Sequence, residues 1–199
     1  MAAATARGWS LDRWRYGPDT DRLVAEAHAR ERWSPEQWAQ HHGAALRRIL
    51  AHANASTPYY RQQWLQRRAQ GDGAHPGDFG AWPILAKATV RQHRELFLSE
   101  YPASRSLFHD HTSGTTGSPL TVTLDRPAVQ AWYALFEARI RRWNGVRRGE
   151  PWAIVGGQLV TPVSATQPPF WVWNAASQQL YLSAYHLSDA NGAAYARAL

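Results

Sequence analysis

The chain has 199 residues, of which 44% are hydrophobic and 19% charged, so it is long and apolar enough to fold around a core. Its formal net charge is +7, and it contains no cysteine, which excludes disulfides, thiolate metal sites and cysteine nucleophiles. No apolar run approaches the roughly 18 residues that cross a bilayer. The first ten residues also lack the apolar centre of a secretory signal, so we expect a cytoplasmic protein with no membrane partner.

The basic residues are arginines apart from Lys87. They occur in scattered pairs, such as Arg47-Arg48 and Arg147-Arg148, and not in one continuous run. A nucleic-acid-binding protein usually gathers its basic residues on one face. This distribution therefore favours a solvated basic surface, and we expect no nucleic-acid partner.

The first third of the chain, to about residue 68, is typical of helices. Ser34, Pro35 and Gln37 form the pattern of a capping box with proline in the first turn, which predicts a helix start. Apolar residues continue at helical spacing to Leu50, and we expect the helix to stop around residues 54–58. A second short helix is predicted over residues 59–68.

Beyond a loop rich in glycine, aspartate and proline at residues 71–80, a helix is predicted up to residue 96. After residue 101 the pattern changes to short strands that alternate with helices. The predicted strands share β-branched and aromatic residues between turn signals, and they cover residues 106–111, 120–124, 152–155 and 179–183.

A strongly amphipathic helix is predicted to begin at residue 127 and to stop at Asn144-Gly145, where glycine suits a left-handed turn. Its apolar face is expected to carry Val129, Trp132, Tyr133, Phe136, Ile140 and Trp143. Ser188 is the predicted cap of a last helix that continues to Leu199. Because that helix has no stop signal, we expect a truncated domain.

The loop between the first two predicted strands carries the candidate chemistry; residues 111–119 read His-Thr-Ser-Gly-Thr-Thr-Gly-Ser-Pro. Glycines let successive backbone amides face one concavity, and the hydroxyls around it add donors, which suits a polyphosphate. An ordinary polar turn has the same composition. The loop is not a Walker A motif, because no Gly-Lys-Ser/Thr follows. The candidate phosphate-binding residues are Thr112, Ser113, Gly114, Thr115, Thr116 and Gly117.

The order of residues in this loop resembles the phosphate-binding loop of the adenylate-forming superfamily, whose members make acyl-AMP from a carboxylate and ATP. Three further segments look like the phenylacetate–CoA ligase family and its CapK branch. They are residues 46–60, residues 83–87 (Pro-Ile-Leu-Ala-Lys) and residues 178–199. The resemblance covers about residues 44–199.

The resemblance implies an α/β chain in which a helical N-terminal part, residues 1–100, leads into an acyl-CoA synthetase-like AMP-binding domain. That large domain would start at residue 101 and be incomplete at residue 199. The resemblance also implies ATP and Mg²⁺ as cofactors, a carboxylic acid as substrate, and coenzyme A as an acceptor in full-length relatives. Ser118 stands where many relatives have lysine, so one phosphate contact is missing.

Relatives of this family are much longer, and their later motifs hold the nucleoside and supply a catalytic lysine. Lys87 precedes the loop and does not replace that lysine by position. We therefore expect the N-terminal portion of an ATP-dependent carboxylate-activating ligase, without catalytic residues of its own and inactive alone. The alternative is a non-catalytic fragment or accessory module that packs against a protein partner, or associates with itself, through exposed apolar surface.

Three further positions carry residue types that suit a functional site. His109 and His111 lie two apart on a predicted strand and face the same way, but no third metal ligand is recognisable, so packing or hydrogen bonding is expected. By the resemblance, Gly156-Gly157 falls near the acyl pocket of similar proteins, although a turn at a strand end is the simpler interpretation. Tyr185-His186 follows a predicted strand and could approach the substrate pocket, but a structural role is the expected one.

Overall fold

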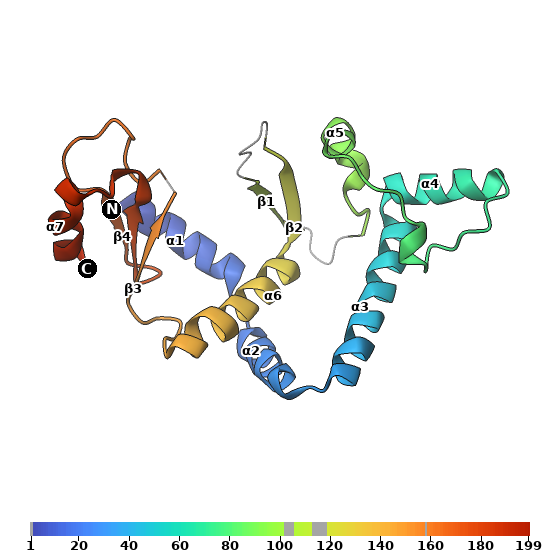
Figure 1. Cartoon of the computed structure of the whole chain (residues 1–199), viewed down its shortest axis with the longest axis horizontal. Helices are drawn as coiled ribbons and strands as arrows, with labels where there is room; N and C mark the ends of the chain where they lie inside the picture. The colour runs from blue at the N-terminus through green and yellow to red at the C-terminus, as the bar shows by residue number, and fades with distance from the viewer. Residues whose placement is uncertain (1, 102–105, 113–118, 158) are drawn as a thin grey trace. The chain divides into compact units, whose positions relative to one another are not determined.

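The computed structural model describes residues 2–101, 106–112, 119–157 and 159–199. The chain is helical up to Phe97 and contains both short strands and helices from Leu107 on, so the predicted mixed α/β class is confirmed (Figure 1). Contacts divide the chain into two compact units, Met1–His28 with Gln130–Leu199, and Ala29–Val129. We call these the first and the second unit. The predicted domain boundary at residue 100 belongs to the family assignment and stays a prediction. Within the described ranges, no helix is both long enough and apolar enough to cross a membrane.

The second unit begins with the helix that its capping box predicts. Ser34 caps α3 (Pro35–Ser56): its Oγ accepts from the Gln37 N–H at 3.3 Å, and the Ser34 N–H donates to Gln37 Oε1 at 2.8 Å. The predicted stop within residues 54–58 is confirmed, because α3 ends at Ser56. Thr57 ends it: this residue precedes Pro58 and has extended backbone, φ −103° and ψ 111°.

Aromatic rings form the core beneath the next helix, α4 (Pro58–Ala69). Trp64 is almost completely buried and lies edge-on to Trp82, with 5.6 Å between ring centroids. The long helix predicted before residue 96 is instead a short helix, α5 (Lys87–Gln92), followed by a 3₁₀ turn, Arg94–Phe97. His93 lies between the two and interrupts the helix, because its backbone dihedral angles, φ −121° and ψ 37°, are outside the helical range.

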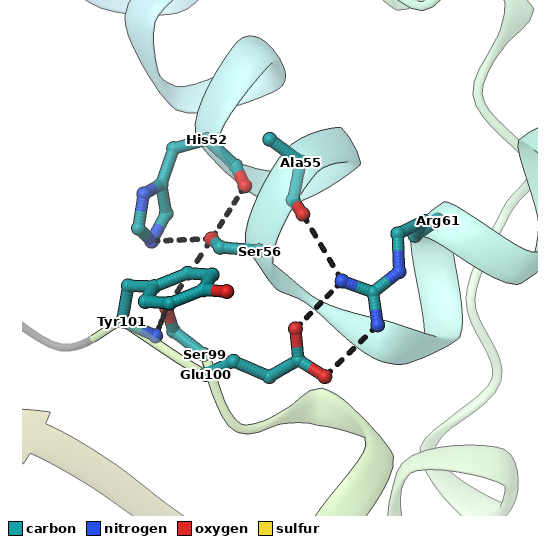
Figure 2. A network of polar contacts seen from close by, with 7 residues as sticks. All are labelled: His52, Ala55, Ser56, Arg61, Ser99, Glu100 and Tyr101. Carbon is teal, nitrogen blue, oxygen red and sulfur yellow. Dashed lines mark hydrogen bonds and ion pairs between the residues drawn. The ribbon is translucent and has the colours of Figure 1, made fainter.

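A polar network fastens the segment after that turn to the junction of α3 and α4 (Figure 2). Arg61 makes two parallel hydrogen bonds with the Glu100 carboxylate, of 2.6 and 2.9 Å. The Glu100 N–H donates to the Ser56 carbonyl, and the Ser99 hydroxyl donates to Ser56 Oγ. The Arg61 hydrogen bonds lower the pKa of Glu100.

An antiparallel hairpin, β1 (Leu107–His111) with β2 (Thr121–Asp125), follows in the same unit. Leu107 lies opposite Asp125, and His111 lies opposite Thr121. These two strands were predicted, and their pairing brings the two ends of the glycine-rich segment together.

In the first unit, α2 (Thr20–Ala29) packs against α6 (Arg126–Phe136). The core between them consists of Val24, Ala27, Ala134 and Ala138. The helical path continues after α6 as a π-helical turn, Glu137–Arg141, and a 3₁₀ turn that ends at Gly145. Gly145 has φ +73°, which confirms the predicted left-handed stop.

Only part of the predicted apolar face of this helix is buried. Trp132, Ile140 and Trp143 are exposed, whereas Ala134, Glu137 and Ala138 are buried. The π turn adds a residue to the helical repeat and so rotates the following side chains relative to a regular helix.

A three-stranded sheet completes the first unit, in the order β3 (Trp152–Gly156), β5 (Gln179–Ser183), β4 (Trp171–Asn174). β3 and β5 are parallel, and β4 is antiparallel to β5. Helix α1 (Ala2–Arg15) contacts β4. The last helix, α7 (Asp189–Ala198), packs its Tyr195 on Phe170 and Leu182. Ser188 precedes α7 as predicted, but its side chain makes no capping hydrogen bond.

Candidate functional site

The predicted phosphate-binding loop connects β1 to β2. Ser113, Gly114, Thr115, Thr116 and Gly117 lie outside the described residues, as does Ser118. Thr112 closes the hairpin: its N–H donates to the Leu120 carbonyl at 3.0 Å, and its Oγ1 accepts from the Leu120 N–H at 2.9 Å. The Thr112 amide is thus already used within the hairpin. Phosphate binding by the loop stays a prediction.

Two histidines stand on β1 next to this loop, on the same face of the hairpin. His109 Nδ1 lies 3.0 Å from Thr123 Oγ1, and His111 Nδ1 lies 3.1 Å from Thr121 Oγ1. Each imidazole therefore forms a hydrogen bond to the threonine opposite it. In the part of the chain that the structure describes, no three metal-ligating side chains gather into a cluster.

The other positions singled out in the sequence lie apart from the hairpin loop. Lys87 is the exposed first residue of α5. Gly157 follows β3, where an added Cβ would lie 3.6 Å from the Tyr185 hydroxyl, an ordinary contact. His186 is buried, hydrogen-bonded to Ser183 Oγ and the Pro162 carbonyl, and stacked on Phe170, so its expected structural role is confirmed.

A cavity of about 500 Å³ in the first unit was not predicted. It lies where the end of α1 meets α6, β3 and β5, and we call it the aromatic pocket. Six of its lining residues are aromatic: Tyr16, Trp132, Tyr133, Phe136, Trp152 and Tyr181. The charged lining residues are Arg15, Arg141, Arg148 and Asp12.

A buried carboxylate supports one wall of this pocket. Glu137, only 2% exposed, accepts hydrogen bonds from Arg141 Nη1 at 3.2 Å and from the Arg148 backbone N–H at 2.9 Å. Arg141 Nη1 also donates to the Tyr16 hydroxyl at 3.2 Å. Burial raises the pKa of Tyr16, and the positive charge of Arg141 opposes this shift. Tyr16 is therefore neutral at physiological pH.

Two signals in the sequence pointed weakly to this arrangement. Glu137 and Arg141 are four residues apart, the spacing at which opposite charges meet on a helix. Arg147-Arg148 is only one of several scattered arginine pairs. Nothing local indicated that these residues would meet Tyr16, which lies more than a hundred positions earlier in the chain.

Comparison of the chain with protein-family models, with curated proteins and with solved structures finds no match.

Proposed function

We propose that this chain is the N-terminal portion of an ATP-dependent ligase that activates a carboxylic acid as acyl-adenylate and transfers it to coenzyme A or another acceptor. Its part is to hold the ATP phosphates in the loop formed by Thr112, Ser113, Gly114, Thr115, Thr116 and Gly117. We assign no catalytic residue to it, and alone it is expected to bind ATP without completing the reaction.

The single observation that carries this proposal is the hairpin beneath the loop. Its strands pair in register, and the Thr112–Leu120 hydrogen bonds bring the two ends of the glycine-rich segment together. The closed base sets where the two ends of this segment lie, and a segment rich in glycine and hydroxyl residues between such ends suits a group of amides that bind an anion. The order of residues in the loop supports a nucleotide phosphate as that anion. Magnesium would accompany the nucleotide, but we assign no residue of this chain to it.

Calorimetric titration of the full chain with ATP–Mg²⁺ tests this proposal. Gly114→Val is expected to abolish binding, because a β-branched side chain both restricts the backbone and fills the space next to the amides. Gly73→Val is the matched control: an added Cβ there meets nothing within 4 Å, and its φ is not positive. Absence of ATP binding by the unmodified chain, or equal binding by both variants, would contradict the proposal.

A second candidate function is that of an accessory module that works by protein–protein packing. The observation that favours it is exposed apolar surface in the first unit, on the turns after α6 and on the edge strand β3. Ile140 and Trp143 are exposed there, as are Ile154 and Val155 on β3. Sedimentation velocity at several concentrations separates the two functions. Association that is strong and independent of ATP would favour the module.

A further inference from the structure

The two histidines of β1 are placed to chelate a metal ion. His109 and His111 are two residues apart on the strand, so their side chains leave the same face about 6.5 Å apart along it. Both side chains are exposed, so their rings have room to turn. Zn²⁺ binds histidine nitrogens at about 2.0–2.1 Å, and two Nε2 atoms on one ion therefore lie about 3–4 Å apart. Rotation of the two rings towards each other brings Nε2 atoms on these side chains to that separation.

Cross-strand hydrogen bonds hold each ring by the nitrogen that the metal does not need. His109 Nδ1 bonds to Thr123 Oγ1, and His111 Nδ1 bonds to Thr121 Oγ1. When Nδ1 donates its proton to the threonine oxygen, Nε2 carries the lone pair that a metal ion requires. Within the described part of the chain, no hydrogen bond reaches either Nε2. Metal-binding histidines are commonly oriented by such a bond from the other ring nitrogen.

The charge of the hairpin strands also favours a cation. The two strands contain Asp110 and Asp125 and no lysine or arginine, although the formal net charge of the whole chain is +7. Asp125 lies opposite Leu107 and therefore on the face that carries the histidines, whereas Asp110 lies on the other face. The Asp125 carboxylate accepts from the Ala128 N–H at 3.0 Å. We therefore assign Asp125 a contribution of negative charge and no role as a ligand.

We propose that His109 and His111 bind one divalent transition-metal ion of the zinc type through their Nε2 atoms, with water in the remaining coordination positions. Imidazole suits Zn²⁺, Ni²⁺ and Cu²⁺, whereas Mg²⁺ prefers oxygen ligands. This inference does not rest on the proposed function, because it uses neither the amides of the loop nor a nucleotide. The Gly114→Val variant is expected to bind Zn²⁺ like the unmodified chain.

Calorimetry of the full chain with zinc chloride, in a buffer without chelating groups, is the test. We expect the tightest Zn²⁺ site to hold one ion per chain and to bind Mg²⁺ at least tenfold more weakly. His109→Gln and His111→Gln should each weaken this site at least tenfold, because a single imidazole cannot chelate. Both side chains are exposed, so each variant should keep the far-ultraviolet circular dichroism spectrum of the unmodified chain. Absence of saturable Zn²⁺ binding, or equal affinity for Zn²⁺ and Mg²⁺, overturns the proposal.

Matched variants locate the ion. His41 and His42 are neighbours on α3, with 6.0 Å between their ring centroids, so His42→Gln is the control and should change the Zn²⁺ affinity less than twofold. Loss of the tightest site in His42→Gln, with no loss in His109→Gln, would place the ion on α3 and refute the proposal.

A further variant tests the hydrogen bond that orients a ligand. Thr123→Val keeps a β-branched side chain on the strand but removes the hydroxyl that meets His109 Nδ1. We expect about tenfold weaker Zn²⁺ binding, the usual effect of losing a hydrogen-bond partner behind a metal ligand. Unchanged affinity in this variant would contradict the proposed orientation of His109.

Discussion

Replacing Glu137 by glutamine should destabilise the first unit severely. The carboxylate is 2% exposed, and the Arg141 side chain that bonds to it is 11% exposed. Removing one partner of a buried ion pair costs about 3–5 kcal/mol, because the other charge is left in a poorly solvating interior. Glutamine keeps an oxygen that can accept from the Arg148 N–H, so we expect a loss near the lower end, about 3 kcal/mol. That is a large fraction of the about 5–15 kcal/mol that stabilises an ordinary domain.

Urea unfolding followed by far-ultraviolet circular dichroism measures this loss. Glu26→Gln is the control, because Glu26 pairs with Arg22 on the exposed face of α2 and its loss should leave the midpoint unchanged. The double variant Glu137→Gln/Arg141→Met removes both buried charges and should recover much of the stability. A loss below about 1 kcal/mol for Glu137→Gln, or no recovery in the double variant, would refute a buried pair at this position.

Three further predictions concern the fold. Ser34→Ala removes the side-chain half of the capping box and should lower the free energy of unfolding by about 1 kcal/mol in urea titrations. Gly145→Ala forces a side chain into a left-handed backbone at φ +73° and should cost about 1 kcal/mol, whereas Gly73→Ala, without a positive φ, should not destabilise. The pKa of Glu100 is lower in the folded protein than in the unfolded chain, so its pair with Arg61 stabilises the fold fully at pH values above the ordinary glutamate pKa of about 4.3. This contribution is lost as the pH falls through the pKa that Glu100 has in the folded protein. Unfolding midpoints of the unmodified chain and Glu100→Gln should therefore differ at about pH 7 and converge towards about pH 3; a constant difference would contradict this role.

The sequence by itself determined the features that depend on near neighbours. The capping box at Ser34, the left-handed stop at Gly145 and the strands on either side of the glycine-rich loop all formed where expected. Each of these depends on hydrogen bonds or backbone preferences among residues close in the chain, so the local pattern contains the necessary information. The end of α3 at Ser56, within the predicted range, has the same local origin, because the residue before a proline is disfavoured in the helical conformation.

Only the tertiary structure decided which face of the helix after residue 126 is buried and where the pocket lies. The aromatic pattern placed Trp132 and Trp143 on the apolar face of the helix, but α2 packs against the side that carries the alanines and Glu137. The strand β4 became apparent only through its pairing with β5. The aromatic pocket likewise requires Tyr16 to meet residues beyond position 130. Contacts between distant segments depend on how whole elements pack, because many faces of similar hydrophobicity compete and only the complete fold selects one.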